Sequence, residues 1–234
     1  MKTKNIVASW RGQPACDKCG VRHVSLFAKV DEKDLEDLGL PIDDMEFHPG
    51  AILYNVRDPG LALFTVRSGL VKLTQYLPNG HQRIVRLLRQ GSTAGLEALL
   101  DQPYEHTATA MQSSLVCRIP ASTLHQLNAR SPVLCRELMQ RWHQSLKKAD
   151  EWLTFLSTGT ARARMARLFL YLRGNSCGPV CQLFGREEVA AILGITSETS
   201  SRLIAELKRE KIINPLSGNR FSCDFPKLEE IALN

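Results

Sequence analysis

Residues 194–204 read Gly-Ile-Thr-Ser-Glu-Thr-Ser-Ser-Arg-Leu-Ile, and this stretch decides how the last part of the chain folds. The segment Arg186–Leu193 before it has the apolar period of a short helix, and Gly194 ends that helix. A second helix is predicted over Thr196–Lys208. Two helices joined by a glycine-bearing turn form a helix-turn-helix. The apolar residues of its inner faces are Val189, Ile192, Leu193, Ile195, Leu203 and Leu207.

The outer edge of the second helix carries side chains that suit base edges in the major groove of DNA. Glutamate accepts a hydrogen bond from cytosine N4, arginine donates two to guanine, and serine pairs with either kind of base. The candidate DNA-binding residues on this edge are Thr196, Ser197, Glu198, Thr199, Ser201 and Arg202. The alternative is a surface ion pair, because Glu198 and Arg202 are one helical turn apart.

The sequence after the second helix predicts a hairpin wing. Lys211-Ile-Ile-Asn-Pro-Leu is followed by the turn Ser217-Gly218-Asn219 and by Arg220-Phe-Ser. The same region holds most of the positive charge, since residues 131–234 carry 15 Lys+Arg against 11 Asp+Glu within a chain total of 30 against 24. A polyanionic partner is therefore expected at this end of the chain.

Between Met45 and Val116 the sequence consists of short β-branched and apolar runs, which are separated by turn dipeptides such as Pro49-Gly50 and Asn79-Gly80. Regular short strands of this kind predict an antiparallel roll or barrel. The predicted strands are Ala51–Val56, Leu61–Arg67, Leu70–Leu77 and Arg83–Leu88. The fold class is α+β, with an N-terminal antiparallel β-roll, a long dimerisation helix and a C-terminal winged helix-turn-helix.

The long helix is predicted to begin at Ser131-Pro132, with serine as its N-cap. One stripe of residues along it steps alternately three and four positions, which is the pattern of a helix pair. We expect this stripe to form a homodimer, with Met139, Leu146 and Leu153 on another face, against the β domain. The candidate interface residues are Leu138, Trp142, Ala149, Trp152 and Leu156.

Length and composition exclude several other classes. The 234 residues are 44% hydrophobic and 23% charged, which is typical of globular domains. No stretch approaches the roughly 20 apolar residues of a membrane span, and the N-terminus lacks the apolar run of a signal peptide. A cytoplasmic protein is expected, with no membrane partner. No nucleophile elbow, phosphate loop or zinc-protease motif is found, so an enzyme is not expected.

A β-roll, a long helix and a winged helix-turn-helix in this order resemble the CRP/FNR superfamily of bacterial transcription regulators. The stretch 194–204 looks like the recognition segment of the FNR branch, in which a Glu-x-x-Ser-Arg pattern reads a TTGAT-type half-site. Glu198, Ser201 and Arg202 match that pattern, whereas Ser197 departs from the arginine of the cyclic-AMP receptor branch. The resemblance implies double-stranded palindromic DNA and RNA polymerase as partners. The implied domains are an N-terminal segment with the Cys-x-x-Cys pair (residues 1–25), the β-roll sensory domain (26–130), the dimerisation helix (131–158) and the winged helix-turn-helix DNA-binding domain (159–234).

The resemblance also implies an oxygen or redox signal. Cys16, Cys19 and Cys117 look like three of the four [4Fe–4S] ligands of FNR, but Ser25 stands where the fourth cysteine should fall. His23 or Asp17 is the candidate fourth ligand. The alternatives are zinc or a thiol switch at the Cys-x-x-Cys pair, and simple core packing of Cys117. Of the seven cysteines, the other four are read as incidental: Cys135 in the helix seam, Cys177 and Cys181 as a loop pair, and Cys223.

Cyclic AMP is an unexpected ligand for this β-roll. Leu96 stands where the family has a glutamate for the ribose, and His106 stands where it has an arginine for the cyclic phosphate. A buried phosphate without that arginine loses a bidentate, charge-assisted anchor. The alternative function is a FixK- or DNR-like regulator without a cluster, which responds to haem, nitric oxide, another nucleotide or no small molecule.

Overall fold

The computed structural model describes residues 9–10, 42–130, 132–173 and 178–233. The chain divides into two compact units, one made of residues 1–75 and 85–147 and the other of residues 76–84 and 148–234. The helical pattern at Asp31–Leu40, the pair Cys16 and Cys19, Asp17, His23, Ser25, Ser131 and Cys177 lie outside the described residues. Among the described helices, none is long and apolar enough to cross a membrane.

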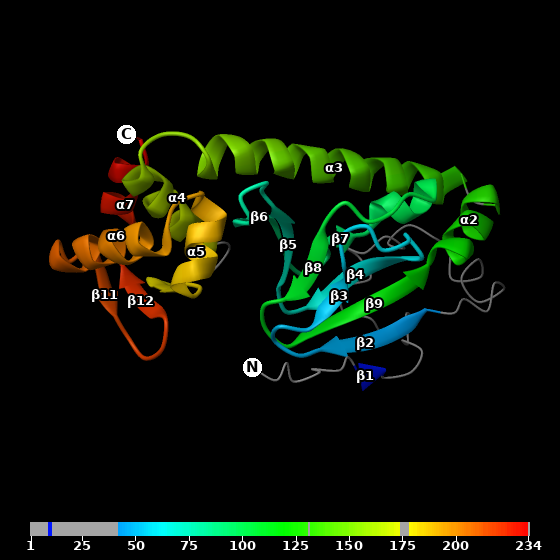
Figure 1. Cartoon of the computed structure of the whole chain (residues 1–234), viewed down its shortest axis with the longest axis horizontal. Coiled ribbons are helices and arrows are strands. Elements are labelled where there is room, and N and C mark those ends of the chain that lie inside the picture. Colours follow the sequence, from blue (N-terminus) through cyan, green and yellow to red (C-terminus); the bar gives the residue numbers. More distant parts are fainter. Residues whose placement is uncertain (1–8, 11–41, 131, 174–177, 234) are drawn as a thin grey trace. The chain divides into compact units, whose positions relative to one another are not determined.

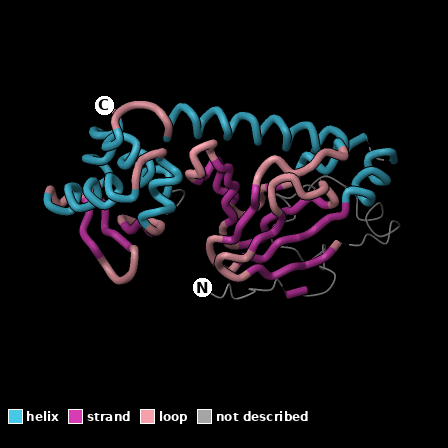
Figure 2. Tube along the Cα trace, in the orientation of Figure 1, coloured by secondary structure: helices cyan, strands magenta, loops and turns pink. Residues whose placement is uncertain are grey.

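The first unit is built on two antiparallel sheets, which confirms the expected β-roll (Figures 1 and 2). A five-stranded sheet has the order β1-β2-β9-β4-β7, and a four-stranded sheet has the order β3-β8-β5-β6. The strands are β1 (Ser9–Trp10), β2 (Asp43–Phe47), β3 (Ile52–Tyr54), β4 (Ala62–Ser68), β5 (Val71–Tyr76), β6 (Gln82–Leu88), β7 (Thr93–Ala94), β8 (Thr107–Ala110) and β9 (Ser114–Pro120).

The turn between β4 and β5 shows why glycine recurs in this region. Gly69 has φ +93°, and a Cβ at this position would lie 2.6 Å from Cα of Ser114. A side chain would therefore meet both an unfavourable backbone conformation and a steric clash with the neighbouring strand. Glycine is therefore required at this turn.

The core of the roll combines aliphatic and aromatic side chains. The rings of Tyr54 and Tyr104 are stacked with centroids 3.9 Å apart, and Phe64 packs 5.4 Å from Tyr54. The Tyr104 hydroxyl donates to the Ala62 carbonyl oxygen at 2.6 Å, so the buried phenol is satisfied. The short helix η3 (Leu96–Leu100) lies between β7 and β8, and α2 (Ala121–Arg130) follows β9. The sequence pattern did not predict α2.

The long helix is α3 (Pro132–Leu156), and its burial corrects the predicted assignment of its apolar faces. Leu138 is buried in the core of the β unit, while Leu156 and Trp152 are buried in the second unit. The indole of Trp152 packs edge-on against Tyr171 at 5.6 Å. These three side chains are therefore buried within one chain rather than exposed to a partner.

The side chains expected to pack on the β domain are instead exposed. Met139, Leu146 and Leu153 are 70%, 58% and 61% exposed, and Trp142 is 42% exposed. At 100° per residue the two apolar stripes lie next to each other on the helix, so periodicity alone does not say which one faces the chain. We define the exposed stripe as Cys135, Met139, Trp142, Leu146 and Leu153, together with the half-buried Ala149.

The second unit is a helical domain with a small sheet. Its elements are α4 (Ala161–Arg173), β10 (Val180–Gln182), α5 (Arg186–Leu193), α6 (Ser197–Arg209), β11 (Ile213–Pro215), β12 (Arg220–Cys223) and α7 (Phe225–Ala232). The sheet order is β10-β12-β11, so the predicted hairpin has a third strand. Phe169 of α4 packs edge-on against Phe221 of β12 at 6.0 Å, which joins the sheet to the helices.

Candidate nucleic-acid interface

The turn between α5 and α6 is formed by the residues that the sequence pointed to. Gly194 has φ +64° and donates its N–H to the Ala190 carbonyl oxygen at 2.8 Å, which ends α5. The Thr196 hydroxyl then accepts a hydrogen bond from the Thr199 N–H at 3.1 Å and caps the start of α6. A left-handed glycine followed by a threonine N-cap fixes the direction in which α6 begins.

One side of α6 is buried and the other carries the predicted reading edge. Leu203, Ile204 and Leu207 are buried, and the buried side also contains Ser200. Of the predicted DNA-binding residues, those exposed to solvent are Thr196, Ser197, Glu198, Ser201 and Arg202. Thr199 differs, because it is half-buried and its hydroxyl is bonded to that of Thr196 at 2.9 Å.

The charged members of this edge are not engaged with each other. Across the described residues, neither Glu198 nor Arg202 takes part in an ion pair or a side-chain hydrogen bond. The alternative of a Glu198–Arg202 surface pair is therefore not what the structure adopts. Both groups present their full hydrogen-bonding capacity to solvent on the same face of the helix.

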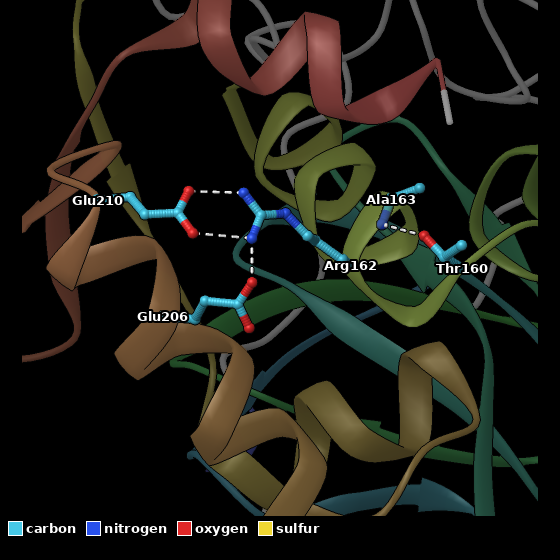
Figure 3. Close-up of polar contacts among 5 residues, drawn as sticks. All are labelled: Thr160, Arg162, Ala163, Glu206 and Glu210. Carbon is cyan, nitrogen blue, oxygen red and sulfur yellow. Dashed lines mark hydrogen bonds and ion pairs between the residues drawn. The ribbon is translucent and has the colours of Figure 1, made fainter.

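An arginine of α4 holds α6 in place (Figure 3). Arg162 donates to the carboxylates of Glu206 and Glu210, and its two bonds to Glu210 measure 2.9 and 2.6 Å. The hydrogen bonds from Arg162 lower the pKa of Glu210 below its usual range, and those from both carboxylates raise the pKa of Arg162. The Thr160 hydroxyl accepts from the Ala163 N–H at 3.1 Å, which anchors the start of α4.

Two further arginines of α4 bind the backbone of the same unit. Arg164 donates to the Leu193 carbonyl at the end of α5, and Arg167 donates to the Ala232 carbonyl at 2.7 Å. Sequence reasoning missed these positioning roles, because basic residues beside a recognition motif read as phosphate contacts. Three of the arginines counted toward the positive end of the chain are thus occupied internally.

The wing offers a separate basic group. Arg220 is exposed at the start of β12, while Lys208 of α6 lies 5.4 Å from the ring of Phe221. A cation over an aromatic face is partly immobilised. Arg220 is thus an exposed basic group beside the turn 217–219.

The described cysteines fall into different environments. Cys117 is half-buried on β9, and Cys135 is exposed on α3. Cys181 and Cys223 are both buried in the sheet of the second unit, and the adjoining Cys181 thiol together with burial raises the pKa of Cys223. Cys181 therefore pairs in space with Cys223 and belongs to a core, a proximity that the loop spacing of Cys177 and Cys181 did not indicate.

The two positions that bear on nucleotide binding are buried. Leu96 is 8% exposed in the apolar core, so it presents no polar atom where a ribose would need one. His106 is 7% exposed, and its Nδ1 lies 3.8 Å from a carboxylate oxygen of Glu97. A carboxylate at this distance makes the position unfavourable for an anion.

Comparison with known proteins places this geometry in a family. A family model for the cyclic nucleotide-binding domain matches residues 44–131, and one for the Crp-like helix-turn-helix domain matches residues 163–231. The chain is 26% identical over 206 residues to the Anaerobic regulatory protein of Pasteurella multocida, covering 85% of this chain and 76% of that protein.

Two further proteins show the same likeness. The chain is 26% identical over 207 residues to the Fumarate and nitrate reduction regulatory protein of Vibrio cholerae, covering 85% of this chain and 82% of the relative. The solved structure of FixK2 from Bradyrhizobium japonicum superposes with a TM-score of 0.73 at 20% identity, covering 82% of this chain and 98% of FixK2, which supports the fold. The chain has the family's two domains in the family's order, and it belongs to the CRP/FNR superfamily of DNA-binding transcription regulators, which are not enzymes.

Proposed function

We propose that the protein binds a TTGAT-type palindrome as a homodimer, with Glu198, Ser201 and Arg202 reading bases in each half-site. The observation that carries this proposal is the exposed, unpaired edge of α6 on a helix fixed by Arg162. Basic groups such as Arg220 contact phosphates and set the register, while the α6 edge supplies the base discrimination. Ser197 and Thr196 lie at the N-terminus of α6, where backbone N–H groups favour a phosphate.

The dimer is proposed to form along the exposed stripe of α3. Met139, Leu146 and Leu153 repeat every seven residues, with Trp142 and Ala149 between them, which is the a/d pattern of two paired helices. Trp142 and Ala149 thus remain from the interface first expected. Two-fold symmetry would present two α6 helices to half-sites about one helical turn apart. RNA polymerase is the further proposed partner of the DNA-bound dimer.

Gel shift with a TTGAT-N4-ATCAA duplex tests the site assignment. The full-length protein is expected to prefer this duplex over a scrambled one at the same salt concentration. Glu198→Ala should reduce that preference, because the cytosine contact is lost. Glu187→Ala removes the same charge from an exposed position in α5 and should leave the preference unchanged. Equal binding to both duplexes by the unmodified protein would refute the assignment.

The signal is proposed to be oxygen or redox state, received by Cys16, Cys19 and Cys117. The names of the two relatives refer to anaerobic regulation and to fumarate and nitrate reduction. Strand pairing also supports the proposal, because Trp10 of β1 pairs with Met45 of β2, and Met45 pairs with Val116 beside Cys117. Two strand spacings are about 10 Å. Cys16 follows Trp10 by six residues, and a segment of that length spans about 20 Å when it is extended. This reach exceeds the roughly 10 Å that separates β1 from β9, so the chain is long enough to bring Cys16 to Cys117.

The available ligand residues determine whether an iron–sulfur cluster can bind. Cys117 is half-buried on β9, where a thiolate can be sheltered yet reached. The set as a whole contains three thiolates, and a [4Fe–4S] cluster normally takes four. A cluster therefore fits only with His23 or Asp17 as its fourth ligand. The proposal rests on the redox sensitivity of the thiols themselves.

Two questions are tested by anaerobic purification followed by iron and sulfide assay, with visible spectra before and after exposure to air. The first is whether the protein senses redox state, and the second is whether it does so through a cluster. An iron-bearing, air-sensitive spectrum would support a cluster. An iron-free protein whose DNA affinity changes with oxidation would support a thiol switch, and Cys117→Ser should abolish either response. An iron-free protein that binds DNA equally before and after air would refute redox sensing.

One observation favours a second function. The matched cyclic nucleotide-binding domain together with Ser25 suits a FixK- or DNR-like regulator that responds to another ligand in the β-roll. Calorimetry with cyclic nucleotides and an absorbance titration with haem distinguish this case. Burial of Leu96 and the carboxylate of Glu97 near His106 argue against cyclic AMP as that ligand.

A further inference from the structure

Three potential metal ligands gather in the β-roll. Glu97 of η3, Glu105 and His106 each bring one ligand atom, and these atoms all lie within 4.8 Å of one another. His106 is buried, Glu97 is half-buried and Glu105 is exposed. The cluster therefore combines a buried imidazole with one half-buried and one exposed carboxylate.

The imidazole carries the main evidence for a ligand. Its Nδ1 is buried and has no hydrogen-bond partner in the described structure, and only 9% of the side chain is exposed. The nearest carboxylate oxygen, on Glu97, is 3.8 Å away, which is too long for a hydrogen bond. A buried nitrogen left unsatisfied costs free energy that a bound group at this position would recover.

The spacing of the ligand atoms suits a metal ion. Two ligands on one tetrahedral ion, each about 2.0–2.2 Å from it, are about 3.4 Å apart. The separation of 3.8 Å between His106 and Glu97 is close to this value, and the exposed Glu105 can complete the set by a small side-chain movement. Water would occupy the remaining positions, as in an open metal site.

The local charge favours a cation over an anion. Glu97 and Glu105 each place a carboxylate oxygen within 4.8 Å of the single imidazole of His106. Two carboxylates beside one imidazole leave a negative cluster.

We propose that Glu97, Glu105 and His106 form a binding site for a first-row divalent transition-metal ion, of which Zn²⁺ and Mn²⁺ are representative. Imidazole nitrogen with carboxylate oxygen is the ligand set that such ions accept, whereas Mg²⁺ and Ca²⁺ prefer oxygen alone. The site stands where Leu96 and His106 replace the groups that a cyclic nucleotide would need. The metal ion would thus take the place of the nucleotide in this roll.

Titration of the full-length, reduced protein with Mn²⁺, followed by the loss of the free-ion electron paramagnetic resonance signal, tests the site. Mn²⁺ is chosen because it prefers oxygen and nitrogen ligands to thiolates, so the cysteines do not compete. One ion should bind per chain, and Zn²⁺ should displace it. Glu97→Gln and His106→Gln should each weaken binding by at least about tenfold, since even partners behind the ligands cost that much.

Two further variants keep the test decisive. Glu105→Gln changes an exposed side chain, so it leaves the fold intact and should still weaken binding severalfold. His125→Gln removes the imidazole of an exposed pair with Asp101, at 3.3 Å, and should leave binding unchanged. Absence of Mn²⁺ and Zn²⁺ binding, or binding that is equal in the Glu97, Glu105 and His125 variants, would overturn the proposal.

Discussion

The helices α6 and α3 are both amphipathic, yet the sequence indicates which face is buried for α6 and does not for α3. In α6 one stripe is apolar and the opposite edge is polar, so only one orientation buries the apolar residues. In α3 two neighbouring stripes are apolar, and the structure buries one of them while leaving Met139, Leu146 and Leu153 exposed. A sequence pattern therefore identifies a binding surface when the surface differs chemically from the core, and it does not when both are apolar.

The largest expected effect tests the exposed stripe of α3. Leu146→Glu would place two charges in the apolar contact between chains, and an unpaired buried charge is costly. We expect the dimer dissociation constant, measured by analytical ultracentrifugation, to rise by at least about a hundredfold. Gln144→Glu adds the same charge on the opposite side of the helix and should leave the dimer intact. An unchanged dimer in Leu146→Glu would show that α3 pairs through another face.

The next effect tests the reading edge of α6. Arg202→Ala removes a two-bond contact to guanine, which is worth about 1–3 kcal/mol in each half-site. Affinity for the TTGAT duplex, measured by fluorescence anisotropy, should fall while affinity for scrambled DNA changes little. Arg209→Ala, at the other end of α6, should weaken binding to both duplexes alike. An equal loss on both duplexes for Arg202→Ala would reassign Arg202 to the phosphates.

A smaller effect distinguishes an arginine that holds α6 in place from one that contacts DNA. Arg162→Gln breaks the bonds to Glu206 and Glu210 and should lower Tm by a few degrees, because α6 is less firmly held on α4. DNA affinity should fall severalfold as a consequence. Arg220→Gln removes an exposed wing arginine and should weaken DNA binding without changing Tm. If Arg162→Gln weakened DNA binding at an unchanged Tm, Arg162 would be a phosphate contact instead.

The smallest effect is a pH dependence of the same pair. Arg162 lowers the folded pKa of Glu210, so the resulting stability is complete above the unfolded pKa and is lost as the pH falls toward the folded pKa. The Tm difference between the unmodified protein and Arg162→Gln should be constant at neutral pH and shrink below about pH 4.5. A difference that stayed constant through this range would show that the ion pair does not contribute.

The sequence predicted those parts of the fold that local chemistry determines. Gly194 and Thr196 fix a turn by backbone conformation and capping, and both act as expected. Helices α2 and α7 were missed, although Asp224 caps α7 and a proline lies in its first turn, and both are sequence signals of a helix start. The proximity of Glu97 and His106 depends on how η3 packs against the start of β8, which no spacing of residues reveals.

The arginines of α4 have a consequence for the thermodynamics of DNA binding. Each cation that neutralises a phosphate releases condensed counterions, so the salt dependence of binding counts the basic groups that reach the DNA. Arg162, Arg164 and Arg167 are bound within their own unit and release none. The slope of log K against log salt should therefore be shallower than the basic composition of residues 131–234 would suggest.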